Sequence, residues 1–487
     1  PFEGPLVRPS DKRAPKKIAW LQCVGSRDLN ACDNGYCSSV CCMVANKQAV
    51  IAKEHSAVEL DTAIFFMDLR TFGKDFDKYA IRAHQDHGVR HVRSRIHSVF
   101  PAADDRLRIV YATESGNSVD EHFDMVVLSV GLAPNPDAVS LAQRLGVDLN
   151  HYSHARTDCL TPVSTNREGI FVCGAFQEPK DIPGSVMEAS AAAAAATGLL
   201  ADSRWSLTRR RELPPELDVS AQGPRIGVFV CNCGINIGGI ADVPAVRDYA
   251  AALPHVVHVE DNLFTCSQDS QDHMKSIIAE KGINRVVVAS CSPRTHEPLF
   301  QETIRDAGLN RYLFEMANIR DQNTWVHMNE PERATRKAKD LVRMAVAKAA
   351  HIEPLHQVSL AIVKRALVVG GGAAGMEAAL GVADQGCDVV LVEQSGELGG
   401  VANLLNATWQ GQPIAAYLAD TIERVKSHPR IQLFTATRVK NTGGSIGNFS
   451  TTLASASGSD TETVVSHGAT ILATGGGEYR PDLYRYG

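Results

Sequence analysis

Residues 365–380, RALVVGGGAAGMEAAL, specify the fold of this chain most directly. The first five residues have the apolar character of a buried strand and lead directly into a run of glycines. That run, Gly370-Gly371-Gly372-Ala373-Ala374-Gly375, fits the pattern G-x-G-x-x-G, and a helix is expected over 376–383. A strand, a glycine turn and a helix in this order form the arrangement that binds a dinucleotide.

The acidic residue of that arrangement is also present. A second strand is expected over 389–392, and Glu393 follows it, 18 residues beyond Gly375. Gly370 would permit the tight turn, Gly372 would let the backbone approach a pyrophosphate, and Gly375 would let the helix pack closely. The helix N-terminus would face the anion, and Glu393 could accept hydrogen bonds from ribose hydroxyls. The alternative is a glycine turn without a ligand.

Two further features favour FAD over NAD. Gly399-Gly400 lies six residues beyond Glu393, and the apolar run 470–473 ends in Thr474-Gly475. Both features recur in flavoprotein reductases with two dinucleotide-binding domains, which the chain resembles here. The resemblance adds two pieces to the expected cofactor site, DMVVLSVG ending at Gly131 and GIFVCGA containing Gly174.

The order of these pieces is unusual, because in that superfamily they follow the glycine turn and here they precede it. A chain that spans the end of one copy and the beginning of a second explains the order. The ends of the chain, Pro1-Phe2-Glu3-Gly4 and Tyr484-Arg485-Tyr486-Gly487, agree with an internal fragment of a longer protein.

The 487 residues divide into three blocks joined by one linker. The first block, 1–205, reads as the C-terminal part of a first flavin unit with a cysteine site. A basic, proline-rich linker covers 206–224, a small α/β domain with cysteines covers 225–355, and the N-terminal part of a second FAD-binding unit covers 356–487. Strands that alternate with helices predict an α/β fold class with Rossmann-like parallel sheets.

Composition excludes two classes of protein. There are 49 basic and 55 acidic residues, a net charge of −6, so no basic surplus exists to bind nucleic acid. No apolar run approaches the roughly 20 residues needed to span a bilayer, so direct membrane insertion is not expected. Since no signal peptide precedes the cysteines, a cytoplasmic location is expected.

The first cysteine site is expected where five of the twelve cysteines fall between Cys23 and Cys42. A helix is expected from Cys37 to about residue 52, which would put Cys37 and Cys41 on one face with Cys42 beside them. Cys23, at the end of a strand expected over 17–22, could supply a fourth thiolate. Four thiolates can hold a [4Fe–4S] cluster or zinc, and the absence of C-x-x-C spacing favours the cluster. Cys32 is a substitute ligand or a bystander.

The second cysteine site is expected in the second block. Cys231 and Cys291 lie at or just past the ends of strands expected over 225–231 and 285–289, whose carboxyl ends would share one edge of a parallel sheet. Cys233 is close to the first of them, and Cys266 follows another strand-like run. The alternative is a set of scattered core cysteines, which is also the interpretation of the single residues Cys159, Cys173 and Cys387.

At this point the sequence resembles a specific family, the A subunits of heterodisulfide reductase. The resemblance covers nearly the whole chain and is carried by four strings, LQCVGSRD (21–28), YCSSVCCM (36–43), CSPRTHEP (291–298) and FEMANIR (314–320). It implies an oxidoreductase that carries FAD and two [4Fe–4S] clusters. Their implied ligands are Cys23, Cys37, Cys41 and Cys42 at the first site, and Cys231, Cys233, Cys266 and Cys291 at the second.

The resemblance also implies a role and partners. Lys47, five residues beyond Cys42, would lie near the flavin ring and stabilise a reduced anionic flavin; a surface lysine is the alternative. The expected function is electron transfer between the flavin and the clusters, with electron bifurcation as a family implication. The expected partners are subunits that resemble heterodisulfide reductase B and C, or hydrogenase or dehydrogenase modules, in a complex that contains a homo-oligomer.

The chain departs from the family in one respect that matters. The family's ferredoxin-type runs with repeated C-x-x-C spacing are absent from this sequence, as is a redox C-x-x-C, so thiol–disulfide exchange by the chain itself is not expected. Two other interpretations stay open. One is a simple NAD(P)H-dependent flavin oxidoreductase, and the other is a non-catalytic scaffold that docks partner reductases.

Overall fold

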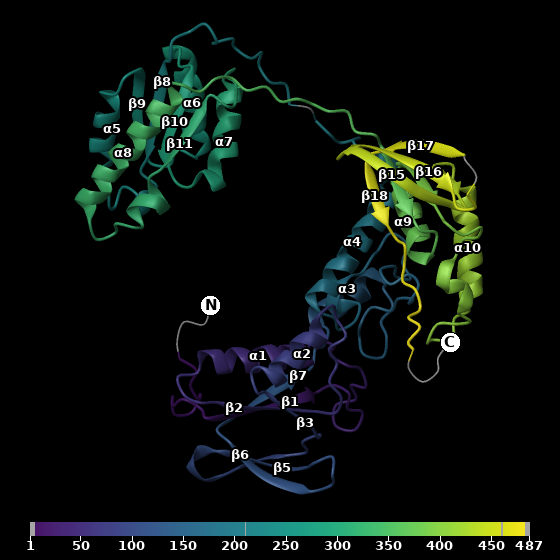
Figure 1. The fold of residues 1–487 in the computed structure, drawn as a ribbon. Coiled ribbons are helices and arrows are strands. Elements are labelled where there is room, and N and C mark those ends of the chain that lie inside the picture. Colours follow the sequence, from purple (N-terminus) through teal and green to yellow (C-terminus); the bar gives the residue numbers. More distant parts are fainter. Residues whose placement is uncertain (1–4, 210, 459–460, 483–487) are drawn as a thin grey trace. The chain divides into compact units, whose positions relative to one another are not determined.

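The structure is a computed structural model that describes residues 5–209, 211–458 and 461–482 (Figure 1). The end segments Pro1-Phe2-Glu3-Gly4 and Tyr484-Arg485-Tyr486-Gly487, and Arg210 of the expected linker, lie outside the described residues. The chain forms two compact units, one of residues 1–204 with 361–487 and one of residues 205–360.

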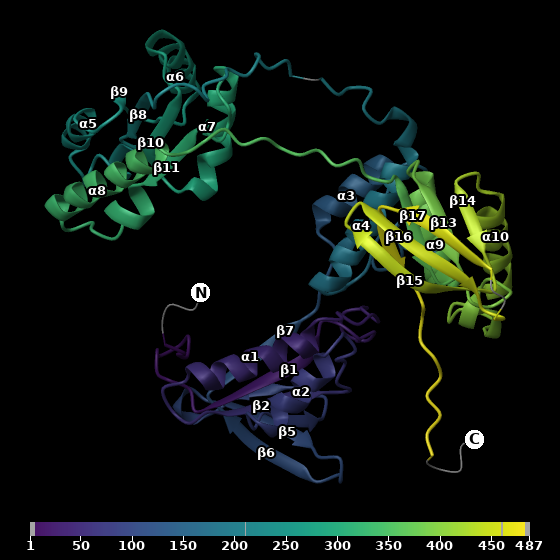
Figure 2. The same cartoon turned by 45° about the horizontal axis from the view of Figure 1, so that its top comes forward.

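The first unit begins with a four-stranded parallel sheet in the order β3-β2-β1-β7. Its strands are β1 (Lys17–Val24), β2 (Asp61–Phe66), β3 (Arg90–Arg93) and β7 (Met125–Val130). One face is covered by α1 (Cys41–His55) and α2 (Phe76–Gln85) (Figure 2). The other packs on an antiparallel sheet of β4 (Val99–Pro101), β5 (Leu107–Ala112) and β6 (Ser118–Phe123), with a short turn η1 (Ala103–Asp105).

Side-chain alternation along β1 explains these two layers. Ile18 and Trp20 point into the core under the helices, while Ala19 and Leu21 point into the core shared with Phe123 of β6. Successive strand residues face opposite sides, so a run that is apolar at every position must be covered on both faces.

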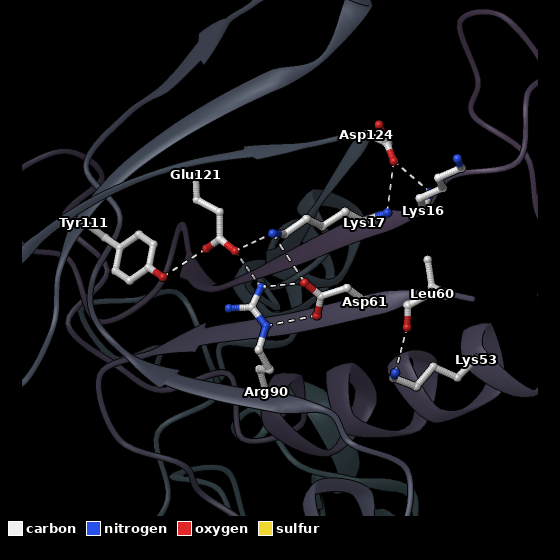
Figure 3. Close-up of polar contacts among 9 residues, drawn as sticks. All are labelled: Lys16, Lys17, Lys53, Leu60, Asp61, Arg90, Tyr111, Glu121 and Asp124. Carbon is white, nitrogen blue, oxygen red and sulfur yellow. Dashed lines mark hydrogen bonds and ion pairs between the residues drawn. The ribbon is translucent and has the colours of Figure 1, made fainter. Parts of the chain in front are cut away.

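Ion pairs join the strands at the amino end of this sheet, as Figure 3 shows. Arg90 donates two hydrogen bonds to Asp61, at 2.9 and 3.0 Å, and one to Glu121 at 2.8 Å. Lys17 Nζ lies 2.6 Å from Glu121, whose other oxygen accepts from the Tyr111 hydroxyl at 2.9 Å. The network ties β1, β2 and β3 to the antiparallel sheet.

Residues 365–472 repeat the same plan. The parallel sheet has the order β14-β13-β12-β18, and an antiparallel sheet of three strands again precedes the last parallel strand. The strands are β12 (Arg365–Val369), β13 (Asp388–Val392), β14 (Ile431–Phe434), β15 (Thr437–Ser445), β16 (Asn448–Ser455), β17 (Glu462–His467) and β18 (Ala469–Leu472). The helices are α9 (Ala373–Asp384), η6 (Gly400–Leu404) and α10 (Ile414–Ser427).

Residues 131–204 complete the first unit. They contain α3 (Pro136–Leu145), η2 (Gly174–Phe176), α4 (Ile182–Leu199) and η3 (Ala201–Ser203). Helix α4 contacts α9, so residues distant in sequence share one packed region. None of the helices in the described residues is both long and apolar enough to cross a membrane.

The second unit is a separate parallel sheet with the order β11-β10-β8-β9 and helices on both faces (Figures 1 and 2). Its central strands are buried at every position, as expected for a doubly covered sheet. The strands are β8 (Ile226–Cys231), β9 (Val256–Asn262), β10 (Arg285–Ser290) and β11 (Phe314–Asn318). The helices are η4 (Gly234–Asn236), α5 (Val243–Ala251), α6 (Gln268–Lys281), α7 (Pro293–Asp306), the π-helix η5 (Arg320–Thr324) and α8 (Pro331–Ala349).

These three parallel sheets confirm the predicted α/β class with Rossmann-like topology. One local expectation was wrong. Helix α1 begins at Cys41 and not at Cys37, because Ser39 adopts a left-handed conformation with a φ of 64° that interrupts a right-handed helix. Cys37 and Cys41 therefore do not share a helix face.

Candidate functional site

The turn between β12 and α9 requires glycine at two positions. Gly370 has a φ of 109°, and a Cβ there would lie 2.3 Å from the carbonyl oxygen of Ala473. A Cβ on Gly375 would lie 1.8 Å from the carbonyl oxygen of Gly370. The turn can therefore close against α9 and β18 only with glycine at these positions.

Glu393 is bonded to this turn. Its Oε2 accepts a hydrogen bond from the Gly371 N–H at 2.6 Å, and its Oε1 accepts from the N–H and hydroxyl of Ser395 at 2.7 and 2.8 Å. Burial raises the pKa of the Glu393 carboxyl, but hydrogen bonds from Ser395 and Gly371 outweigh it, so the pKa is lowered. The carboxylate thus stays ionised beside the turn.

A cavity of about 1190 Å³ opens over this turn. Gly372 lines it, and a Cβ on Gly372 would meet no atom within 4 Å, so the backbone here is left open to a ligand. The N-terminus of α9 is at the same place. The predicted cofactor residues that line this cavity are Gly370, Gly372, Glu393, Gly399, Gly400, Thr474 and Gly475. An open glycine backbone, a helix N-terminus and an ionised carboxylate fit a dinucleotide.

Two predicted cofactor residues lie elsewhere. Gly131 packs against the loop after β1, where a Cβ would lie 3.0 Å from Ser38 Oγ. Gly174 donates its N–H to Glu188 of α4 at 2.9 Å. Neither is among the described residues that line the cavity. Gly375 does not line the cavity either, but it allows the glycine turn beside the cavity to close.

The first cysteine site lies where β1 passes into α1. Cys23 has a left-handed φ of 60°, and its thiol and those of Cys41 and Cys42 interact directly and are all buried. The Cys37 thiol accepts the Ser39 N–H at 3.3 Å and acts electrostatically on Cys42. The structure thus brings Cys23, Cys41 and Cys42 into contact and places Cys37 within electrostatic reach of Cys42.

Shared hydrogen bonds couple three of these thiols. The contact with Cys41, and then burial, raise the pKa of Cys23. The contact with Cys23 lowers the pKa of Cys41, but the contact with Cys42 and burial outweigh it and raise the pKa to about 11. The contact with Cys41 lowers the pKa of Cys42. Three soft donors in contact, with Cys37 within electrostatic reach, supply the kind of ligand that an iron–sulfur cluster takes.

Two arginines lie beside this site. Arg27 acts electrostatically on Cys23 and Cys37, and it also forms an ion pair with Asp68. Arg70 donates to Asp68 at 3.1 Å and acts on Cys37. The positive charges are thus partly neutralised by one carboxylate.

The second cysteine site lies at the carboxyl edge of the sheet in unit 2. Cys231 ends β8, and its sulfur accepts the Thr265 N–H at 3.5 Å, directly before Cys266. Cys291 follows β10 and lies within electrostatic reach of Cys231 and Cys233. Cys266 packs against the same core as Cys291. Cys291 thus lies within electrostatic reach of two cysteines, and Cys266 follows the neighbouring strand β9; cysteine thiolates of this kind are the ligands of iron–sulfur clusters.

Electrostatics at this second site involve one arginine. Burial raises the pKa of the Cys231 and Cys291 thiols, and at Cys291 the charge of Arg320 opposes the rise. Arg320 Nη1 donates to Cys233 Sγ at 3.8 Å. In neither cysteine site do three Cys, His, Asp or Glu side chains of the described residues converge on one point as ligands of a single metal ion.

The remaining candidates are more exposed. Lys47 is exposed on α1 and is absent from the described residues that line the cavity. Cys32 is exposed, and its thiol donates to the Asp28 carbonyl at 3.3 Å. The interpretation of Cys159 and Cys173 as buried was wrong, because both are exposed, and Cys387 is half-buried.

Sequence reasoning missed the arginines beside the sulfurs. Arg27 and Arg320 both stand within the strings that carry the family resemblance, so the signal was present. Their role depends on contacts across loops that no local pattern specifies.

Comparison with known sequences supports this picture. The family described as "Pyridine nucleotide-disulphide oxidoreductase" matches residues 32–196, and the family described as "FAD dependent oxidoreductase" matches 366–452, where the cavity lies. Both descriptions name the predicted enzyme class, oxidoreductase, and the second supports FAD.

One solved structure shows how weak the overall structural likeness is. A thioredoxin reductase of T. acidophilum is 14% identical over 37% of this chain and 51% of its own, with a TM-score of 0.26. The fold assignment therefore rests on the strand order described above.

Curated relatives are more similar. The A subunit of the H(2):CoB-CoM heterodisulfide,ferredoxin reductase of Methanothermobacter marburgensis is 51% identical over 227 residues, 46% of this chain and 34% of the relative. One iron-sulfur A subunit of the CoB--CoM heterodisulfide reductase of Methanopyrus kandleri is 46% identical over 232 residues, 47% of this chain and 35% of the relative. The alignments thus span about a third of the length of these relatives. Over the aligned part of the chain, they confirm the predicted resemblance to the A-subunit family of heterodisulfide reductase.

Proposed function

We propose that this chain is an FAD- and [4Fe–4S]-dependent electron-transfer subunit of a complex that resembles heterodisulfide reductase. One observation carries the proposal. In each of the three parallel sheets, candidate cofactor residues follow the carboxyl ends of strands: cysteines after β1, cysteines at or after the ends of β8, β9 and β10, and the glycine turn after β12. This edge is where α/β sheets bind their ligands.

The flavin would be held by the cavity over β12. The open backbone at Gly372 and the N-terminus of α9 would receive the diphosphate. Glu393 Oε1 already accepts two hydrogen bonds from Ser395, but Oε2, which accepts only from Gly371, keeps a second lone pair for a ribose hydroxyl. Bound FAD would supply an acceptor for electron pairs that can release electrons singly.

The clusters would be held by the two sets of four cysteines. Burial of Cys23, Cys41 and Cys42 excludes water from the first site, and burial of Cys231 and Cys291 does so at the second. Iron–sulfur clusters supply one-electron transfer. Arg27 and Arg320 place positive charge beside the sulfurs, which favours thiolates over thiols.

The chief rival is a simple NAD(P)H-dependent flavin oxidoreductase. The description of the family that matches residues 32–196 favours it. Against it, the crossing from β1 to α1 carries Cys37, Cys41 and Cys42 where a nicotinamide dinucleotide would need a glycine turn. The cysteines therefore favour the electron-transfer proposal.

Further parts of the proposal follow from the family resemblance. Lys47 would approach the flavin, Gly131 and Gly174 would belong to a flavin unit, and electron bifurcation would take place in a cytoplasmic complex. Partner subunits of the heterodisulfide reductase B and C kind, or hydrogenase or dehydrogenase modules, would exchange electrons with it. The relatives' names describe subunits of heterodisulfide reductases, which supports the expectation of partner subunits.

The test is anaerobic purification followed by an absorption spectrum and assays of iron, sulfide, zinc and flavin. About eight iron and eight sulfide per chain are expected for two four-iron clusters, with absorbance that bleaches on addition of dithionite. Flavin bands are expected in the same spectrum. Zinc without sulfide, or flavin alone, would contradict the electron-transfer role and leave the simple flavoprotein or the docking scaffold.

A further inference from the structure

Arg320 occupies an unusual backbone position in unit 2. Strand β11 ends at Asn318, and the chain turns at once into the π-helix Arg320–Thr324. The Arg320 N–H donates to Asn318 Oδ1 at 3.2 Å, and the Trp325 N–H donates to the Arg320 carbonyl at 3.0 Å. Turns of this wide kind are rare and concentrate at functional sites.

The π-helix places Trp325 against the Arg320 side chain. The guanidinium carbon lies 4.8 Å from the centre of the indole ring, within the range of a cation–π contact. The indole N–H donates to Asn236 Oδ1 at 3.3 Å, and the Asn236 amide donates to the Cys233 carbonyl at 3.3 Å. The guanidinium is therefore oriented by the same loop that carries Cys233.

This guanidinium has unused hydrogen-bonding capacity. Nη1 donates to Cys233 Sγ at 3.8 Å, but the buried Nε has no hydrogen-bond partner among the described residues. The Asn318 amide nitrogen, at the carboxyl end of β11, is buried and equally unpartnered there. Buried donors are normally satisfied. Two unpartnered donors beside Cys233 and Cys291 indicate an acceptor that belongs to this sheet edge.

The charge of Arg320 is also uncompensated. No Asp or Glu oxygen of the described residues lies within 4.0 Å of its guanidinium, whereas Arg27 at the first cysteine site is paired with Asp68. The second site therefore holds a fixed positive charge in contact with sulfur.

We propose that Arg320 is a positioning residue of the second cysteine site, which donates to the sulfur atoms held there and raises the reduction potential of the bound cluster. The inference rests on the proposed function, because it assigns a [4Fe–4S] cluster to these cysteines. Reduction adds one negative charge to a cluster, and a nearby cation stabilises the reduced form more than the oxidised form. Hydrogen bonds to cluster sulfurs act in the same direction.

The test uses the whole chain with the first site disabled by Cys41→Ser and Cys42→Ser, so that a single cluster is observed. Arg320→Gln and Arg320→Lys are compared with Arg343→Gln, which removes an exposed arginine of α8 paired with Asp340. Iron and sulfide content and the midpoint potential, from redox titration followed by electron paramagnetic resonance, are measured for each variant. The resonance reports only loaded clusters, so incomplete loading does not prevent the measurement.

For Arg320→Gln, at least a tenfold lower ratio of reduced to oxidised cluster is expected at a fixed potential. This corresponds to a midpoint about 59 mV more negative for a one-electron couple. Arg320→Lys, which keeps the charge, and Arg343→Gln are expected to stay near the parent value. A loaded Arg320→Gln variant with the parent midpoint would overturn the proposal and leave the proposed function standing.

Loss of the cluster is also informative. If Arg320→Gln holds no cluster, a loaded Arg320→Lys variant with the parent midpoint supports the role of the charge. If the lysine variant is empty too, the electrostatic role is contradicted, because the charge is still present. If the parent chain itself holds no iron at this site, the proposed function fails, and this inference fails with it.

Discussion

The carboxylate of Glu393 accepts the N–H of Gly371 at a distance of 2.6 Å. The bond joins the residue after strand β13 to the middle of the glycine turn. Glu393 therefore supports the turn as well as lining the cavity. Both roles require an oxygen acceptor toward Gly371 and another toward Ser395.

Replacement of Glu393 by glutamine is expected to destabilise the flavin-binding repeat. A glutamine has one oxygen and one NH₂ group, so its NH₂ must face the N–H of either Gly371 or Ser395. An unsatisfied buried donor costs about 1–3 kcal/mol. The free energy of unfolding by urea and the flavin content measure the effect. Glu397→Gln, at an exposed position that lines the cavity, is the control. It is expected to keep the parent's free energy of unfolding and flavin content.

Gly372→Ala separates flavin binding from folding. The added methyl group meets no protein atom within 4 Å, so the fold should tolerate it, but it reduces the space at the backbone where the diphosphate is expected. At least a tenfold weaker affinity for FAD is expected, measured by titration of the apoprotein, with an unchanged urea midpoint. Gly381→Ala in α9 also has open space and should keep FAD while gaining about 0.5–1 kcal/mol of stability. Equal flavin affinity in the two variants would contradict the proposed site.

Cys41→Ser is expected to remove the first cluster. The thiol contacts both Cys23 and Cys42, so its loss leaves the other thiols without a central partner. Iron should fall from about eight to about four per chain, as expected for one remaining four-iron cluster. Cys32→Ser is the matched control, since that thiol is exposed and bonded only to a local carbonyl, and its iron content should match the parent. Equal iron loss in both variants would contradict the ligand assignment.

Arg90→Met is expected to destabilise the first sheet in a pH-dependent manner. Burial raises the pKa of the Asp61 and Glu121 carboxyls, but hydrogen bonds from Arg90 to Asp61 and from Lys17 to Glu121 outweigh it, so both pKa values are lowered. Carboxyls with lowered folded-state pKa values stabilise the fold above their unfolded values of about 4, and this contribution is lost as the pH falls through the folded values.

Arg90→Met should therefore lower the free energy of unfolding by about 1–2 kcal/mol at pH 7. The decrease is modest because these side chains are partly exposed and solvent screens their charges. It should shrink toward zero below about pH 3. Urea unfolding at both pH values measures it. Arg108→Met, which breaks a more exposed pair with Asp120 on the same unit, should give a smaller change at pH 7. A loss in Arg90→Met that is independent of pH would contradict the ion-pair explanation and indicate packing alone.

Several features of the fold were predictable from local sequence. The strand expected over 365–369 has those bounds in the structure, and the strand expected over 389–392 begins one residue earlier, because apolar runs bounded by polar turns are local signals. The helix after the first cysteine site was placed four residues too early, since the left-handed Ser39 gave no sequence signal. Glycine is the usual mark of that conformation, and serine is not.

Local sequence alone was sufficient to predict the glycine turn, the parallel α/β class and the residue types of both cysteine sites. Backbone sterics at Gly370 and Gly375 and the apolar character of the strands act over a few residues, so they can be read without the fold. The contacts of the folded chain were needed to show that Gly131 and Gly174 stand apart from the cavity and that Arg320 contacts Cys233. Arg320 and Cys233 are 87 positions apart, and strand order and packing, not local pattern, bring such residues together.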